Sequence, residues 1–147
     1  MRVTREIVLS APPAQVWPAL WDVPRMVDCV PGCVDAREIE PRRRYAARMT
    51  QQVGPIRLSI PLDIEVTEEA PNRLVLKAKG RDSLVATGVS MTVRLDLGPR
   101  EAGSCLRVDA EGRVLGQVAA LGHSIIQRRA DELVDEFAAR LERALSR

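Results

Sequence analysis

The residues best suited to soft metal coordination are three cysteines and one histidine. They are Cys29, Cys33, Cys105 and His123, and in number they could form a Cys₃His zinc site. Zinc modules usually bring their ligands as two closely spaced pairs, whereas only Cys29 and Cys33 are close here, on either side of a Pro-Gly turn. An odd number of cysteines without a signal peptide also favours reduced thiols. The spacing therefore predicts no bound metal, and nothing else in the sequence indicates a cofactor.

The same histidine is the only one available for acid–base catalysis. Any mechanism that needs an imidazole must use His123, and no Gly-x-Ser-x-Gly nucleophile motif accompanies it. No Asp, Glu, Lys or His falls at the inward-facing strand positions identified below. We therefore predict that His123 lies at the boundary of an amphipathic helix and that the protein is not an enzyme.

The charge balance argues against nucleic acid as a partner. Basic residues number 22 and acidic residues 20, for a formal net charge of +2. Only four aromatic side chains, Trp17, Trp21, Tyr45 and Phe137, are available to stack on bases. The basic run Arg42-Arg43-Arg44 follows several acidic residues that can neutralise it, which is typical of a solvated turn.

The elements that must position these residues begin with one strand and two short helices. Alternating apolar and polar residues predict a strand over 3–9. Pro13 suits the first position of a helix whose apolar residues share one face. A second helix is predicted over 23–29, with Asp22 as its cap and Pro31-Gly32 as its end.

From residue 34 to residue 115 the hydrophobic pattern has a period of two. Turn residues recur between the alternating stretches, which is typical of consecutive antiparallel strands. Between Ile56 and Val66 every second residue is a branched aliphatic one, so the predicted sheet has one apolar face and one wet face. The predicted strands are 34–40, 45–53, 56–68, 73–80, 87–97 and 105–115.

The last part of the chain has a helical period. Apolar or small residues spaced by three or four run from Val118 through Gly122 to Ala144, which predicts one helix over 117–145, about 43 Å long. Its other face is polar, so one stripe must be buried against the apolar face of the sheet. The predicted fold is α+β: a helix-grip arrangement with a seven-stranded curved antiparallel sheet around a long C-terminal helix and two short helices between strands 1 and 2. We expect residues 1–147 to form a single ligand-binding domain.

Several short motifs along these elements resemble those of a known family. The matching stretches are Ala11-Pro12-Pro13 with Val16-Trp17, Val30-Pro31-Gly32-Cys33, Val53-Gly54-Pro55-Ile56, and Leu121-Gly122 with Ala130, Leu133, Phe137 and Leu141. Together they cover nearly the full length. On these residues the chain resembles the START/Bet v 1-like (SRPBCC) superfamily and, within it, the family of the G subunit of carbon monoxide dehydrogenase.

This resemblance implies a helix-grip domain that binds a lipophile and serves as an accessory to a molybdenum-containing CO dehydrogenase or a related hydroxylase. It does not imply catalysis. No apolar run approaches the roughly 18 residues of a membrane span, and the N-terminus does not read as a signal peptide, so we expect a cytoplasmic protein. Some family members carry a C-terminal tail for membrane association, whereas this sequence ends at Arg147. We therefore expect at most weak peripheral membrane contact, with recruitment by a partner.

The inward residues of the predicted sheet and helix outline a candidate cavity. Nearly all are aliphatic, and Gln51 is the expected polar hook because an unpaired buried amide costs about 1–3 kcal/mol. Gly122, in the middle of the predicted helix, indicates either close packing or space kept for a ligand. The predicted ligand-binding residues are Trp17, Met26, Val30, Met49, Gln51, Leu58, Ile60, Ala78, Met91, Gly122, Ile125 and Ile126.

Three functions remain open at this point. The leading one is non-enzymatic binding of a hydrophobic small molecule, such as a lipid or an isoprenoid quinone, between sheet and helix. The second is a cyclase or hydrolase-like enzyme of the same fold, which would need acid–base groups inside the cavity. The third is an assembly factor with a filled core, which docks on a partner enzyme through an exposed apolar patch.

Overall fold

The computed structural model describes residues 1–145; Ser146 and Arg147 lie outside the described part of the chain. Its elements, in chain order, are β1 (Arg2–Leu9), α1 (Pro13–Trp21), α2 (Val23–Asp28), β2 (Cys33–Glu40), β3 (Arg44–Val53), β4 (Ile56–Ala70), β5 (Arg73–Asp82), β6 (Thr87–Arg100), β7 (Gly103–Gly116), the 3₁₀ turn η1 (Val118–Leu121) and α3 (His123–Leu145).

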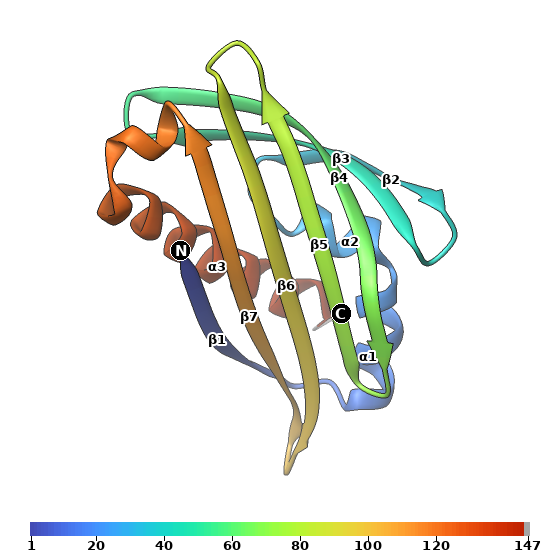
Figure 1. Cartoon of the computed structure of the whole chain (residues 1–147). Coiled ribbons are helices and arrows are strands. Elements are labelled where there is room, and N and C mark those ends of the chain that lie inside the picture. The colour runs from blue at the N-terminus through green and yellow to red at the C-terminus, as the bar shows by residue number, and fades with distance from the viewer. Residues whose placement is uncertain (146–147) are drawn as a thin grey trace.

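All seven strands form one antiparallel sheet in the order β1-β7-β6-β5-β4-β3-β2. The sheet curves around α3 (Figure 1), while α2 packs against β2 and β3, and α1 packs against β6 and β7. This is the predicted α+β helix-grip fold, and every predicted strand is present. Most strands extend further than the alternation indicates, because backbone pairing continues through the polar ends of the hairpins.

The C-terminal helix is shorter than predicted. The expectation of one helix over 117–145 was wrong at its start, because the chain forms the short turn η1 and then breaks at Gly122. Gly122 has φ 100° and ψ 156°, a conformation that is essentially restricted to glycine. The apolar spacing continues through this break, which is why the helical period alone did not reveal it.

The two short helices, α1 and α2, lie where the capping and proline residues of the sequence predict them. Helix α1 contains Pro18 without ending there, and it runs to Trp21. The Asp22 carboxylate accepts a hydrogen bond from the Arg25 backbone N–H at 3.4 Å and so caps α2, as predicted. None of the helices in residues 1–145 combines the length and the apolar character that crossing a bilayer requires.

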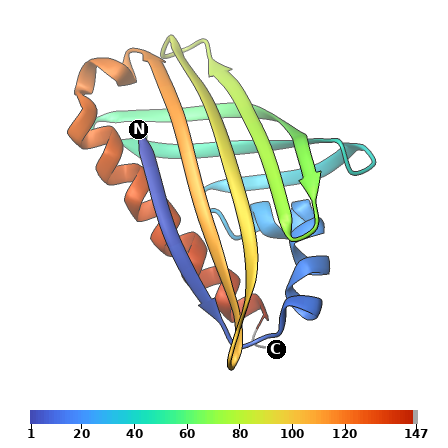
Figure 2. The same ribbon diagram turned by 60° about the horizontal axis from the view of Figure 1, so that its bottom comes forward.

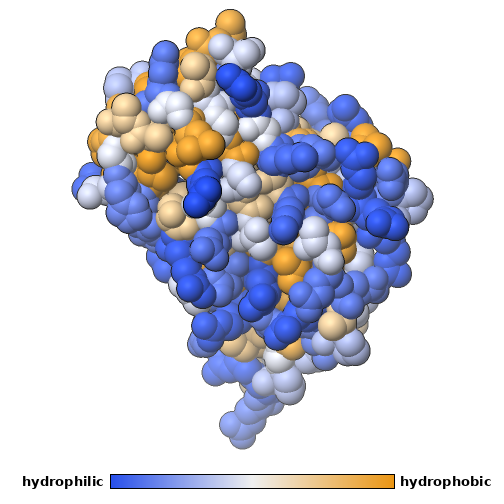
Figure 3. Space-filling model, viewed as in Figure 1, coloured by the Kyte–Doolittle hydropathy of each residue, from blue (hydrophilic) through white to orange (hydrophobic). Residues whose placement is uncertain are grey.

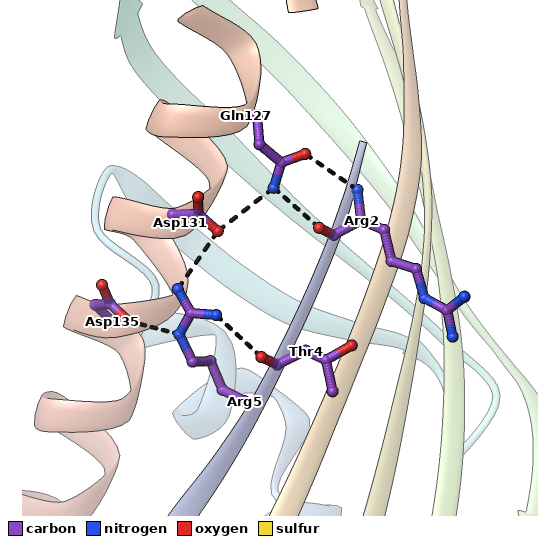
Figure 4. A network of polar contacts seen from close by, with 6 residues as sticks. All are labelled: Arg2, Thr4, Arg5, Gln127, Asp131 and Asp135. Carbon is purple, nitrogen blue, oxygen red and sulfur yellow. Dashed lines mark hydrogen bonds and ion pairs between the residues drawn. The ribbon is translucent and has the colours of Figure 1, made fainter. Parts of the chain in front are cut away.

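Helix α3 is fastened along the edge strand β1 by polar contacts (Figure 4). The Gln127 Nε2 donates to the Arg2 carbonyl at 2.9 Å, and the Arg2 backbone N–H donates to the Gln127 Oε1 at 3.4 Å. The Arg5 guanidinium pairs with Asp135 at 2.9 Å and with Asp131 at 3.4 Å. These contacts satisfy backbone groups of an edge strand and place the apolar face of α3 toward the sheet.

The other side of α3 has fewer attachments. Near its C-terminus, the Arg25 Nη2 of α2 donates to the Ala144 carbonyl at 3.0 Å. Nearer its start, Arg129 reaches the Gln51 side chain of β3. Figure 2 shows α3 lying beside β1 and crossing the strands at an angle.

Candidate functional site

An apolar cavity of about 230 Å³ lies between the inner face of the sheet and α3. Strands β3 to β7 supply one wall, α3 supplies the other, and α2 with the segment after it closes one end. The inward positions of the long central strands carry small side chains such as Val89 and Ala78, which line this space. The lining residues of α3 run from Ile126 to Phe137, a length of about 16 Å along the helix axis.

Most of the residues predicted to bind a ligand surround this cavity. Those that line it are Met26, Val30, Met49, Gln51, Leu58, Ala78, Met91 and Ile126. The strand members follow the period-two parity, since a side chain two residues from an inward one also faces inward. That they contact a ligand stays a prediction.

Four predicted residues do not line the cavity. Trp17 packs edge-to-face against Trp21 in α1, with ring centroids 6.3 Å apart. Ile60 is fully buried, and its side chain occupies the space that the missing Cβ of Gly80 leaves open. Ile125 is 39% exposed. Gly122 is exposed at the break before α3, where a Cβ would have no other atom within 4 Å.

Several lining residues were missed by the site prediction. One group comes from α3 and comprises Arg129, Ala130, Leu133, Val134 and Phe137. Most belong to the predicted apolar stripe, so their spacing from Ile126 could have identified them. Arg129 follows Ile126 by three positions and so lies on the same side of the helix, but a charged residue is normally assigned to the wet face.

The predicted polar hook is already bound by protein groups. Gln51 is 4% exposed; its Nε2 donates to the Pro31 carbonyl, and its Oε1 accepts from Arg129 Nη2 at 2.7 Å. Arg129 Nη1 lies 3.4 Å from a Glu132 carboxylate oxygen, and its buried Nε has no hydrogen-bond partner within residues 1–145. These contacts draw the polar atoms away from the cavity, so its wall is almost entirely hydrocarbon.

The thiols near the cavity are neutral at physiological pH. Burial raises the pKa of the Cys33 thiol to about 11, and burial also raises the pKa of Cys29. The Cys29 Sγ donates to the Arg25 carbonyl at 3.6 Å. A protonated thiol is a poor nucleophile and a poor metal ligand. Within residues 1–145, no group of three or more His, Cys, Asp or Glu side chains is arranged to hold a metal ion.

Acid–base groups are not gathered in the cavity wall. Among the described residues, Arg129 is the one lining residue with an ionisable side chain other than a thiol. His123 is exposed at the first position of α3. The arrangement can therefore hold an apolar molecule, and it offers no paired acid and base to act on one.

The family of the chain follows from a comparison with protein-family models. The model of the G subunit of carbon monoxide dehydrogenase (CoxG) matches residues 6–146. The chain belongs to the CoxG family. A search of the curated proteins found no match.

Solved structures of low sequence identity share the fold of this CoxG-family chain. A conserved protein from Geobacillus kaustophilus is 22% identical, with a TM-score of 0.86 over 99% of this chain and 95% of that one. A START superfamily protein from Mycobacterium smegmatis is 17% identical, with a TM-score of 0.69 over 99% of this chain and 97% of that one. A protein from Chromobacterium violaceum is 20% identical, with a TM-score of 0.64 over 96% and 97% of the two chains. At these identities the likeness establishes the START-like fold alone.

Proposed function

We propose that this CoxG-family protein binds a hydrophobic small molecule in the cavity between the sheet and α3, without catalysing a reaction. The observation that carries the proposal is the hydrocarbon wall of a cavity of about 230 Å³. An apolar cavity of about 150 Å³ already binds benzene, while drug-sized ligands occupy about 300–1,000 Å³. The volume therefore suits one chain of a lipid or part of the tail of an isoprenoid quinone.

The shape of the cavity favours an elongated ligand. The helix contributes lining residues over three turns, and the central strands contribute them over a similar length. Each methylene group that leaves water stabilises the complex by about 0.8 kcal/mol, which is roughly a fourfold gain in affinity. Binding energy therefore accumulates along the chain of the ligand and needs no polar hook at Gln51.

The partner enzyme and the cellular location that we propose are those of the family. We propose that the loaded protein serves a CO dehydrogenase-type molybdenum hydroxylase as an accessory, in the cytoplasm and at the inner face of the cell membrane. Support comes from the family match over residues 6–146 and from the START-like fold. Reconstitution with such an enzyme, purified from the same host, would test this partner separately from the ligand.

A chain-length series tests the ligand proposal. Delipidated protein is loaded with a fluorescent hydrophobic dye, which is then displaced by straight-chain alcohols of increasing length and by a short-tailed ubiquinone analogue. We expect the affinity to rise about fourfold per added methylene and to level off once the cavity is full. If the dye does not bind, or if affinity is independent of chain length, the proposed function is wrong.

A further inference from the structure

Four aliphatic side chains lie at one end of the molecule, on the β5–β6 loop, at the end of β7, in η1 and in the first turn of α3. Leu84 is 94% exposed, Leu115 is 64% exposed and Ile125 is 39% exposed, while Leu121 is half-buried beside them. We call these four residues the aliphatic tip. In Figure 3 hydrophobic residues gather at the top and upper left, where Figure 1 places the β5–β6 loop and the turn into α3.

Three loops bring the aliphatic tip together. The Gln117 backbone N–H donates to the Ala86 carbonyl at 3.2 Å, which ties the segment after Leu115 to the loop that carries Leu84. The β3–β4 turn lies against the other two members, since a Cβ at Gly54 would be 3.3 Å from Leu121 Cδ1. These contacts place Leu84 near Leu115, and Leu121 near Ile125, at one end of the molecule.

Arginines stand directly behind this apolar region. Four arginines lie two or three residues along the chain from Gly54, Leu84, Leu115 and Ile125; they are Arg57, Arg81, Arg113 and Arg128, in that order. None of the four is in an ion pair within residues 1–145. On a strand, two or three residues correspond to about 7–10 Å, which applies to Arg57, Arg81 and Arg113. Arg128 lies on α3, where the three residues from Ile125 correspond to about 4.5 Å. Amphipathic elements bury their apolar face about 5–10 Å into the boundary between lipid headgroups and acyl chains. The spacing thus puts the guanidinium groups at headgroup depth when the leucines are inserted.

Acidic residues are nearly excluded from this end. The segment 112–130 contains no Asp or Glu, and the one acid in the β5–β6 loop, Asp82, is 6% exposed. Its carboxylate accepts hydrogen bonds from the backbone N–H groups of Ser59 and Leu84, both at 2.9 Å, and so shapes the loop. At the opposite end of the sheet some arginines have acidic partners, as in the ion pairs Arg42–Glu69 and Arg73–Glu68.

Residues next to the aliphatic tip in the sequence line the cavity. Val114 and Ile126 line the cavity, and their neighbours in sequence, Leu115 and Ile125, belong to the tip. Val53, the last residue before the β3–β4 turn, also lines the cavity. A hydrophobic molecule that leaves a bilayer at the tip would have a short path to the hydrocarbon wall.

We propose that the aliphatic tip docks on a membrane surface that contains anionic lipids, with its leucines in the headgroup region and the four arginines on the lipid phosphates. In the headgroup region the exposed aliphatic side chains are removed from water, and the unpaired arginines lie close to negatively charged lipid phosphates. The argument for docking depends only on the aliphatic tip and the nearby arginines, whereas a role in ligand transfer rests on the proposed function. It gives a location to the weak peripheral contact expected from the sequence.

Vesicle co-sedimentation of the whole chain tests the docking surface. Wild type is compared on phosphatidylcholine vesicles with and without phosphatidylglycerol, beside Leu84→Asp and a matched control, Ile39→Asp. Ile39 is 51% exposed on β2, away from the tip, so it controls for the loss of one exposed aliphatic side chain. Each basic residue near an anionic surface favours binding by about fivefold.

We expect wild type and I39D to bind the anionic vesicles at least tenfold more tightly than the neutral ones, with binding that weakens as salt is added. L84D should lose at least tenfold on anionic vesicles while its circular dichroism and melting temperature match those of wild type. The proposal is overturned if wild type does not prefer anionic vesicles, or if L84D binds them as wild type does; failure on all vesicles would assign the tip to a protein partner instead.

Dye loading in the absence of vesicles separates the two proposals. The L84D variant should take up the hydrophobic dye as wild type does, because Leu84 does not line the cavity. If wild type does not bind the dye, the proposed function is refuted and membrane docking still stands. Normal dye uptake with no preference for anionic vesicles would refute docking and leave the binding function standing.

Discussion

Replacing Ala78 by leucine should stabilise the ligand-free protein, which is an unusual outcome for a larger side chain inside a sheet. Ala78 lies in the middle of β5 and lines the cavity. Leucine adds three carbons, and burying them contributes about 2 kcal/mol at ~0.8 kcal/mol per carbon. Ordering the new side chain costs about 0.5–1 kcal/mol. The expected net gain is about 1–1.5 kcal/mol in the free energy of unfolding.

A matched substitution should have the opposite sign. Ala47 lies in the middle of β3, is 6% exposed and does not line the cavity. Ala47→Leu adds the same three carbons where protein atoms already fill the space. Overpacking of this kind costs about 1–3 kcal/mol. The comparison therefore separates an open space from a filled one by the direction of the change.

Urea unfolding of delipidated protein measures both variants, and dye uptake measures the consequence for binding. Because its side chain occupies part of the cavity, A78L should also weaken long-chain ligands more than short ones. If A78L and A47L are destabilised to a similar degree, the space beside Ala78 is not available and the cavity argument fails. If A78L is stabilised but binds long chains as well as wild type does, the ligand lies elsewhere.

Three further predictions concern Gly122, Gln51 and Cys33. Gly122→Ala should lower the free energy of unfolding by about 1–3 kcal/mol, because the positive φ at this position is strained for alanine. Gly88 has equal space around it and no positive φ, so Gly88→Ala should lower it by under 1 kcal/mol. Equal urea midpoints for the two variants would contradict this. Gln51→Leu should cost about 1–3 kcal/mol because two partners lose a hydrogen bond, while exposed Gln52→Leu should change stability little. Because the pKa of Cys33 is about 11 in the folded protein, the thiol ionises at a lower pH in the unfolded chain, and the free energy of unfolding should fall as the pH rises from about 9 to 11. Cys33→Ala should flatten this part of the pH profile. An unchanged slope would refute the raised pKa of Cys33.

The sheet was predictable because its signal is local. Alternating residues such as those from Ile56 to Val66 must face opposite sides of a strand, and Gly-Pro or Pro-Asn turns separate the strands. The start of the last helix was not predictable in the same way. The spacing of Val118, Gly122 and Ile126 fits a continuous helix, and only the backbone conformation of Gly122 reveals the break.

The cavity was predictable only as a set of inward faces. Parity places Gln51 and Leu58 on the inner face, but it does not report whether neighbouring atoms fill the space above them. Ile60 has the same parity and is nevertheless enclosed beside Gly80. Arg129 shows the converse limit, because its long side chain crosses from the border of the helix to a buried amide that no sequence pattern links to it.

The occupancy of the cavity after gentle purification tests the central claim most directly. Native mass spectrometry of the whole chain, followed by solvent extraction, reports whether a molecule from the host is bound and what its mass is. The account predicts an extractable, largely apolar molecule with a long hydrocarbon chain, bound in wild type and reduced in A78L. A protein that carries no extractable molecule and takes up neither long-chain alcohols nor a quinone analogue when these are added would contradict it.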